Sequence, residues 1–340
     1  MITHREIESA ELDQYIRAHH PEANFLQSSA WGEAQKLRGA QVIRLGFFDD
    51  EQPVGATQII IRSSRRGNHL EIAGGPLIDW NDQSLTEYVI KTIRSLAKKH
   101  HCVYARIRPQ VFESSGMMER LKKLGLKRAS YHLHAEHTIL LGLAPTEDEL
   151  LANMRRQTRY EIRRAAKIPE IEVSYSTDPS LIETFYEMQQ STAERQDFHA
   201  PDLKELEAIH QALDEIDGVR IYYATVDGNI LSMALILKFG EEIDYLEAAS
   251  FPEARKYPLA YAIQWRIIRD AKNNGLKRYN MWGIAYSDNP NHRFAHVTTF
   301  KKGFGGEPVA YTPAHDLIID RLRYTPIRLI ELARKKRRKL

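Results

Sequence analysis

Apolar and polar positions follow the same order in two distant parts of the chain. Residues 47–61 (FFDDEQPVGATQIII) and 224–238 (ATVDGNILSMALILK) each read as a strand, an acidic or polar turn, and a second strand. They align without a gap, so that Asp50 falls on Asp227 and the small Gly55 on Ser232. This self-similarity predicts one β-hairpin in each half of the chain.

The segments that follow the two hairpins also correspond. Each hairpin precedes a strand, an amphipathic helix and a further strand, at 69–76, 85–101 and 102–109 in the first copy and at 243–250, 259–275 and 278–285 in the second. The pattern predicts an α/β (α+β) protein of two tandem domains, each a mixed, mostly antiparallel sheet flanked by helices. Chance similarity between generic α/β segments is the alternative.

The length of 340 residues also favours two domains, because it exceeds what one hydrophobic core usually serves. We expect one domain to comprise residues 1–137 together with a C-terminal helix at about 313–340. Residues 138–312 are expected to form the other domain.

The segment between the two copies predicts a strand and one long helix. Residues 138–143 are strand-like, and Thr146 with Glu149 forms a capping box that opens the helix. An apolar stripe then continues until Pro169.

The other side of that predicted helix is strongly basic. Arg155, Arg159 and Arg163 recur every four residues, and like charges at this spacing repel each other. The helix face is either an ordinary solvated surface or a binding site for an anion, and the pattern leaves both interpretations open.

The composition narrows the class of protein. Hydrophobic residues make up 43% of the chain and charged residues 27%, and the formal net charge is only +3, so any anion site must be local. The single cysteine, Cys102, cannot form an internal disulfide and is expected in the core. No run approaches the roughly 20 apolar residues of a spanning helix, and no signal peptide opens the chain. We expect a cytoplasmic protein, or at most a peripheral one.

One pair of histidines raises the question of a metal. His132 and His134 would share one face of a strand over 132–137, but no cysteine or matching pair of carboxylates accompanies them. No metal site is therefore predicted.

The hairpin–strand–helix–strand order resembles the core of the GNAT-type acyltransferases. In these enzymes a Q/R-x-x-G-x-G/A loop opens the helix, and its backbone N–H groups bind the pyrophosphate of coenzyme A. Here the corresponding residues are 254–261 (ARKYPLAY), in which Arg255 and Ala260 fit the ends but Pro258 replaces a glycine and lacks an N–H. Coenzyme A is therefore disfavoured as a cofactor, although acyl transfer is not.

Five sequence blocks together resemble a more specific family. The blocks are 24–39 (NFLQSSAWGEAQKLRG), 74–80 (GGPLIDW), 150–167 (LLANMRRQTRYEIRRAAK), 279–285 (YNMWGIA) and 300–311 (FKKGFGGEPVAY). In this order they are similar to the Fem-type aminoacyltransferases that build the interpeptide bridge of peptidoglycan. Each block alone is weakly specific, but together they cover nearly the whole chain.

The resemblance implies a reaction and its partners. Family members have two GNAT-like domains and transfer an amino acid from aminoacyl-tRNA to the side-chain amine of the peptidoglycan stem peptide. The acceptor is UDP-MurNAc-pentapeptide or its lipid-linked form, lipid II. No cofactor or metal is implied, and a monomer is expected. The alternatives are a coenzyme-A-dependent GNAT N-acyltransferase and a non-catalytic protein that binds RNA or a membrane surface.

The resemblance also implies which residues form the site. Lys301 would stabilise the oxyanion or the terminal phosphates of the tRNA, and Phe300 would pack beside the terminal adenosine. The remaining candidates are Lys36, Trp31, Arg195 (near Phe198 and His199) and Tyr245 for the acceptor, and Arg159, Arg163 and Lys302 for tRNA or phosphate contacts. Lys302 ranks below Lys301, because it would point to the opposite side if this segment is a strand.

The sequence departs from the family at two places. Asn280 stands where relatives often carry an acid, so no general base is assigned there. Residues 199–218 hold only a short helix, in place of the long two-helix arm of some relatives. The basic end of the chain, 327–340 (IRLIELARKKRRKL), would lie on anionic lipid, contact tRNA or remain solvated.

Overall fold

The computed structural model describes residues 1–196, 200–286, 292 and 294–337, and the chain forms two compact units. Unit 1 comprises Met1–His137, Ala285–Arg293 and Val309–Leu340, and unit 2 comprises Thr138–Ile284 and Phe294–Pro308. Each unit holds one sheet with its own hydrophobic core.

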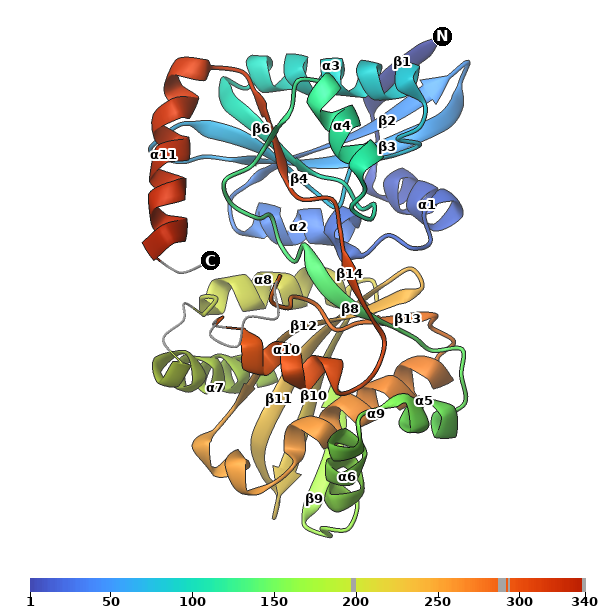
Figure 1. Ribbon diagram of the computed structural model, residues 1–340, viewed down its shortest axis with the longest axis vertical. Helices are drawn as coiled ribbons and strands as arrows, with labels where there is room; N and C mark the ends of the chain where they lie inside the picture. Colours follow the sequence, from blue (N-terminus) through green and yellow to red (C-terminus); the bar gives the residue numbers. More distant parts are fainter. Residues whose placement is uncertain (197–199, 287–291, 293, 338–340) are drawn as a thin grey trace. The chain divides into compact units, whose positions relative to one another are not determined.

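Unit 1 is a sheet in the order β1-β2-β3-β4-β6-β15-β7, with the short β5 paired to β3. Figure 1 shows α3 and α4 on one face of this sheet and α1 and α2 on the other. The strands are β1 (Ile2–Glu6), β2 (Gln41–Asp49), β3 (Gln52–Arg62), β4 (Asn68–Ala73), β5 (Leu77–Ile78), β6 (Cys102–Arg108), β7 (Lys127–Arg128) and β15 (His315–Ile318). The helices are α1 (Ser9–His19), η1 (Phe25–Gln27), α2 (Ser29–Leu37), α3 (Gln83–Lys99), α4 (Ser115–Lys123) and α11 (Arg321–Arg337).

Unit 2 repeats the design with the sheet order β14-β8-β13-β12-β11-β10-β9. Its strands are β8 (His137–Gly142), β9 (Ile171–Ser176), β10 (Val219–Val226), β11 (Asn229–Phe239), β12 (Glu242–Ser250), β13 (Arg278–Asn280) and β14 (Glu307–Ala310). Its helices are α5 (Glu147–Asn153), α6 (Arg156–Ala165), α7 (Leu181–Gln196), α8 (Leu203–Asp214), η2 (Pro252–Lys256), α9 (Leu259–Asn273) and α10 (Ala295–Lys302).

The predicted internal repeat is confirmed in the order and pairing of its strands, although the strand expected over 278–285 ends at Asn280. In each unit an antiparallel hairpin (β2–β3 or β10–β11) continues into an antiparallel third strand, and that strand pairs in parallel with the strand after the helix (β4 with β6, β12 with β13). An antiparallel strand then closes the parallel pair, β15 in unit 1 and β8 in unit 2.

The correspondence extends to single residues of the hairpins. In the first hairpin Phe47 pairs with Gly55, and the register then shifts by a β-bulge. In the second hairpin Ala224 pairs with Ser232, and the shift follows at the same place. In the gapless alignment Phe47 falls on Ala224 and Gly55 falls on Ser232. The two copies therefore share a β-bulge at the same position, which unrelated hairpins would not share.

The two hairpin turns also match. Asp50 and Asp227, aligned in the sequence, have φ angles of 43° and 49°, and the residues after them, Glu51 and Gly228, have φ angles of 69° and 78°. Two successive residues with positive φ are typical of the two-residue turn that suits the twist of a hairpin.

A buried ion-pair network attaches α11 to the sheet of unit 1. Arg106 on β6 donates to both carboxylate oxygens of Asp316 at 2.8 and 2.9 Å, and to both of Glu331 at 3.2 and 2.9 Å. The hydroxyl of Tyr324 donates to Asp316 at 2.7 Å. No helix within the described ranges, α11 included, is long and apolar enough to cross a membrane.

Two predictions about local structure are wrong. The helix expected from Thr146 to Pro169 has the predicted capping box, but it is divided into α5 and α6, because Met154 adopts an extended conformation (ψ 153°). The strand expected over 132–137 begins only at His137, because His134 has a left-handed conformation (φ 57°) that no strand accommodates. Cys102 is buried in the core as predicted, and burial raises the pKa of its thiol to about 11.

Candidate active site

The site lies in unit 2, where the two parallel strands of its sheet separate. The β12–β13 ladder holds only three residue pairs and ends where Asp244 pairs with Asn280. β12 continues to Ser250, paired only with β11, whereas the chain after Asn280 leaves the sheet. The carboxyl ends of parallel strands are the usual place for a ligand in such sheets, because the diverging strands open a crevice there.

Lys301, in the last turn of α10, places its ammonium near the point where β12 and β13 separate. Its side chain is 6% exposed, and its ammonium donates to the carbonyl oxygen of Gly283 at 2.8 Å. On the other side the ammonium lies 5.3 Å from the ring centroid of Tyr245 on β12. Burial lowers the pKa of Lys301 to about 7, although the negative charge of Glu247 acts in the opposite direction.

Glu247 is a site residue that the sequence analysis missed. A β-bulge separates it from Tyr245 on β12, and its carboxylate accepts a hydrogen bond from Gln189 on α7 at 3.2 Å. Burial raises the pKa of Glu247 to about 7, and the charge of Lys301 opposes this shift. The site therefore holds an acid and a base that both titrate near neutral pH, which is characteristic of catalytic groups.

Asn280 has a structural role beneath the site. Its amide donates to Glu242 at 2.9 Å, and its side-chain oxygen accepts from Thr138 and from the backbone N–H of Trp282. Asp244 is fully buried beside Glu242, and burial together with that neighbouring carboxyl raises the pKa of Asp244 well above its usual value. An acid at position 280 would be a third carboxyl in this cluster, whereas the neutral amide can donate to Glu242.

Phe300 belongs to a cluster of aromatic rings beside Lys301. Its ring lies edge-on to Tyr261 at 5.2 Å and to Phe304 at 5.1 Å between centroids, and it is half-buried. The segment is helical up to Lys302, so the strand considered for it was wrong. Lys302 is exposed at the end of α10.

Arg195 lies at the far end of β12. Its guanidinium donates to the carbonyl oxygen of Ser250 at 2.6 Å and to the hydroxyl of Thr192 at 3.1 Å. Strand β12 thus carries Tyr245 and Glu247 and contacts Arg195 at its end. Phe198 and His199, which the sequence analysis placed near Arg195, lie outside the described residues.

The basic segment at 154–167 contacts the turn that follows Lys301. The backbone N–H of Arg155 donates to the carbonyl oxygen of Gly303 at 2.9 Å. Gly303 must be a glycine, since a Cβ atom there would lie 2.4 Å from the hydroxyl of Thr158. Two of the sequence blocks are therefore adjacent in unit 2.

The arginines of this segment differ in their contacts. Arg159 donates to the carbonyl oxygens of Ala152 and Met154, and so it satisfies the C-terminal end of α5. Arg163 is exposed and makes no hydrogen bond or ion pair within the described part of the chain. Of the two, only Arg163 is available to a ligand without loss of an internal contact.

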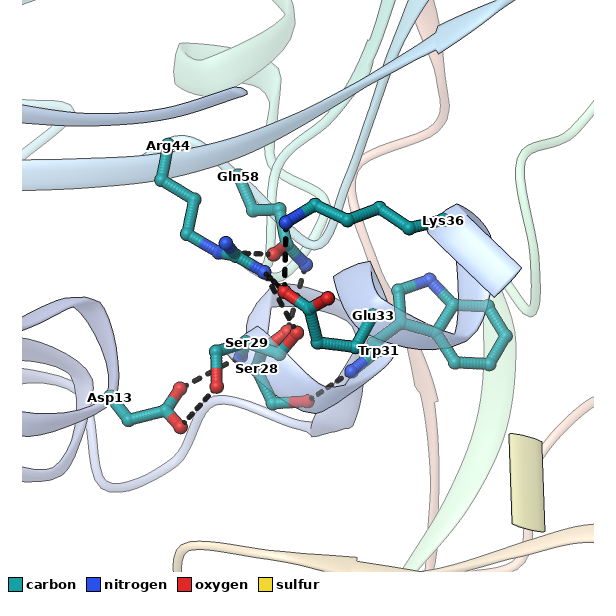
Figure 2. A network of polar contacts seen from close by, with 8 residues as sticks. All are labelled: Asp13, Ser28, Ser29, Trp31, Glu33, Lys36, Arg44 and Gln58. Atoms are coloured by element: carbon teal, nitrogen blue, oxygen red, sulfur yellow. Dashed lines mark hydrogen bonds and ion pairs between the residues drawn. The ribbon is translucent and has the colours of Figure 1, made fainter. Parts of the chain in front are cut away.

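Trp31 and Lys36 lie in unit 1 on α2, the helix shown in Figure 2. The hydroxyl of Ser28 caps this helix by accepting from the backbone N–H of Trp31 at 3.1 Å. Lys36 is exposed and pairs with Glu33 at 2.9 Å. Glu33 also pairs with the buried Arg44 on β2 at 2.7 Å, so one carboxylate forms ion pairs with both Lys36 and Arg44.

Comparison with known proteins identifies the fold. The crystal structure of FemX matches with a TM-score of 0.86 at 20% identity, over 97% of this chain and 100% of that one. A tandem GNAT protein from the clavulanic acid biosynthesis pathway matches with a TM-score of 0.58 at 12% identity, over 94% and 99% of the two chains. The fold is therefore a tandem pair of GNAT-like domains, as predicted.

Comparison of sequences identifies relatives. The chain is 24% identical over 254 residues to a lipid II:glycine glycyltransferase of Staphylococcus aureus. The match covers 71% of this chain but only 58% of that protein. A model of the FemAB family matches residues 7–204 and 202–332, which confirms the resemblance found in the sequence. Because these matches include nearly the whole chain, the protein belongs to the FemAB family.

Proposed function

We propose that this protein transfers an amino acid from aminoacyl-tRNA to the side-chain amine of a peptidoglycan stem peptide. The family and the glycyltransferase relative support the reaction class. The observation that carries the proposal is that the buried Lys301 and the half-buried Glu247 act on each other by charge and that each group has a pKa of about 7. A transfer between an ester and an amine needs one group that stabilises an oxyanion and another that accepts a proton.

The reaction assigns one role to each group. The acceptor amine attacks the carbonyl carbon of the aminoacyl ester, and the negative charge that develops on the carbonyl oxygen is stabilised by the Lys301 ammonium. Glu247 takes the proton that the amine loses. The new amide bond forms as the ester C–O bond breaks, and the ribose oxygen of the tRNA leaves as a hydroxyl with the proton that Glu247 took from the amine.

The remaining candidates are assigned to binding. Phe300 would pack on the terminal adenosine, while Arg163 and Lys302 would contact tRNA phosphates. For the acceptor we propose Lys36, Trp31, Arg195 and Tyr245. We assign Arg159 no contact with tRNA, since its guanidinium already donates to two backbone carbonyl oxygens and so stabilises the end of α5. The acceptor is UDP-MurNAc-pentapeptide or lipid II, and the basic end of α11 would favour lipid II at an anionic membrane surface.

The test is radiolabel transfer from charged tRNA to each of the two acceptors. Lys301→Ala should lower kcat/KM by about 100-fold or more, the typical effect of removing one oxyanion donor. The exposed Lys204→Ala in the same unit is the matched control and should transfer at the wild-type rate. Failure of the wild-type protein to transfer to either acceptor would exclude the proposal.

A coenzyme-A-dependent reaction is the alternative. Pro258 occupies the N-cap of α9 and makes no side-chain cap hydrogen bond. It offers no N–H to a pyrophosphate, so the helix start lacks a donor that such a ligand needs. Saturable binding of acetyl-coenzyme A in a calorimetric titration would favour this alternative over tRNA-dependent transfer.

A further inference from the structure

Unit 1 contains a fully buried arginine that forms no ion pair with an acid in the part of the chain that the structure describes. Arg108, the last residue of β6, is 0% exposed, and none of its three guanidinium nitrogens has a hydrogen-bond partner in the described structure. The ring centroid of Tyr311 lies 5.6 Å from its guanidinium carbon. Burial lowers the pKa of Arg108, but a guanidinium does not lose its proton in proteins. A buried, unpaired charge of this kind costs several kcal/mol unless an anion compensates for it.

Arg106, two residues earlier on the same strand, provides an internal comparison. It is buried to a similar degree, and the carboxylates of Asp316 and Glu331 satisfy its guanidinium. The acid that acts on Arg108 by charge is Glu136, but its carboxylate accepts from the backbone N–H of Ala314 at 2.9 Å. No ion pair between Arg108 and an acid occurs among the described residues, so the fold supplies a counter-charge at one position and not at the other.

Two side-chain amides whose nitrogens have no partner in the described structure lie near Gly74, which is hydrogen-bonded to the backbone of Arg108. A Cβ atom on Gly74 would lie 3.5 Å from the side-chain oxygen of Asn24 and 3.7 Å from that of Gln110, and the N–H of Gly74 donates to the carbonyl oxygen of Arg108. The amide nitrogens of both Asn24 and Gln110 lack partners within the described part of the chain. Gln110 as a whole is only half-buried, although its amide atoms are buried.

Helix α2 carries two more side chains with buried polar atoms that have no hydrogen-bond partner in the described structure. The amide of Gln35 and the indole N–H of Trp31 are buried without a hydrogen-bond partner in the ranges that the structure describes. They are four residues apart and therefore share one face of the helix. Buried polar groups are normally satisfied in proteins, so the unpaired guanidinium of Arg108 and the unpaired amide nitrogens of Asn24 and Gln110 indicate a missing polar partner.

The internal repeat gives this region a counterpart. The Lys301 site lies at the carboxyl ends of the parallel strands β12 and β13 in unit 2. Arg108 lies at the carboxyl end of the equivalent pair in unit 1, where β4 and β6 end with the pairing of Ala73 and Arg108. In both units a buried cation therefore occupies the place where a parallel sheet of this kind binds ligands.

We propose that the region around Arg108, Gln110 and Asn24 is a binding site for a carboxylate. A carboxylate can accept two parallel hydrogen bonds from the planar guanidinium while the neighbouring amides donate to the rest of the ligand. We assign this carboxylate to the acceptor peptide, and this assignment rests on the proposed function. Two sources have this chemistry, namely a carboxylate on the residue that carries the accepting amine and the C-terminal carboxylate of the peptide.

The test measures binding of three synthetic stem peptides to the full chain by calorimetry. The first contains meso-diaminopimelate at the third position, the second replaces it with L-lysine and so lacks one carboxylate, and the third is the first with a C-terminal carboxamide. Loss of the recognised carboxylate should weaken binding about 30-fold or more. A loss with the lysine peptide assigns the site to the accepting residue, and a loss with the carboxamide assigns it to the C-terminus.

Variants of Arg108 complete the test. In Arg108→Met the difference between the peptides should disappear, and the ligand-free protein should melt at a higher temperature, because an unpaired buried charge is gone. Arg108→Lys keeps the charge without the planar fork and should retain only part of the discrimination, which preserves the test if the methionine variant does not fold. Equal binding of all three peptides, binding of none, or unchanged discrimination in Arg108→Met would overturn the proposal. Discrimination without transfer from charged tRNA would instead overturn only the proposed function.

Discussion

The charges of Lys301 and Glu247 oppose the effect that burial has on the pKa of each group. Burial alone would make both groups neutral, whereas the charge of each partner favours the charged form of the other. Both pKa values consequently lie at about 7, so a small change in pH or in solvation moves a proton into or out of the pair. A lysine and a glutamate at the protein surface would both remain charged at this pH.

The pH dependence of transfer should reveal this pair. The proposed reaction needs Glu247 without its proton and Lys301 with its proton, so kcat/KM should follow a narrow bell with both limbs near pH 7. Glu247→Gln should remove the acidic limb and lower the rate by about 100-fold or more. It should also move the alkaline limb to lower pH, because Glu247 raises the pKa of Lys301. An acidic limb that persists in this variant would show that another group is the base.

The stability of the protein should depend on Lys301 in a defined pH window. The folded-state pKa of about 7 lies below the usual 10.5, so the unfolded chain binds more protons between these values. The free energy of unfolding should therefore rise with pH across this window, by at most about 1.4 kcal/mol per pH unit. Lys301→Met should abolish that rise, whereas Lys204→Met should leave it unchanged in urea titrations at pH 7 and pH 10.

Arg159 and Arg163 should give different phenotypes despite their equivalent positions in the sequence. Arg159→Ala removes hydrogen bonds to the end of α5 and should lower the free energy of unfolding by about 1 kcal/mol. Arg163→Glu should leave stability unchanged and weaken binding of charged tRNA, with a smaller salt dependence of the binding constant. Lys204→Glu controls for a general change in charge. Normal tRNA affinity in Arg163→Glu would return this helix face to an ordinary solvated surface.

Gly303 should tolerate no side chain. In Gly303→Ala the new methyl group would lie 2.4 Å from the hydroxyl of Thr158 and 2.9 Å from the carbonyl oxygen of Phe300. We expect a loss of about 1–3 kcal/mol of stability and a drop in transfer, since the turn fixes the end of the Lys301 helix. Adding Thr158→Ala should restore part of the stability. Gly142→Ala, whose Cβ meets no atom within 4 Å, is the matched control.

The network of Arg106 should contribute strongly to the stability of unit 1. Arg106→Met leaves the carboxylate of Asp316 buried without its cation, and loss of one partner of such a pair costs about 3–5 kcal/mol. Hydrogen exchange should accelerate along α11, which is attached through Glu331. The exposed Arg128→Met should change stability by less than about 0.5 kcal/mol. Equal effects of the two substitutions would contradict the structural role of the pair.

The parts of the fold that the sequence predicted are those set by local pattern. The two hairpins, the helices after them and the capping box at Thr146 depend on alternation, helical periodicity and turn residues within short windows. The break between α5 and α6 at the extended Met154 could not be predicted in this way, because the next residue, Arg155, makes a backbone hydrogen bond to the distant Gly303 that no local pattern shows. Tertiary contacts of this kind override a continuous helical pattern.

The residues of the candidate site could be predicted only in part from the sequence, for the same reason. Lys301 and Tyr245 came from the family resemblance, and the structure brings them together. Glu247 has no motif of its own, since its significance comes from a bulge in β12 and from burial beside a lysine 54 positions later in the sequence. Arg108 belongs to no motif, and in the structure its missing partners distinguish it from Arg106, which is paired with two acids.

The sheet of unit 1 has a consequence for synthesis of the protein on the ribosome. Strand β15 is inserted between β6 and β7, yet it is separated from them in the chain by all of unit 2. When residues 315–318 leave the exit tunnel, the strands of unit 2 have already been made, so unit 2 can close its sheet first. Unit 1, although translated first, must wait with an open gap between β6 and β7. A nascent chain stalled before His315 would therefore present these exposed strand edges to chaperones.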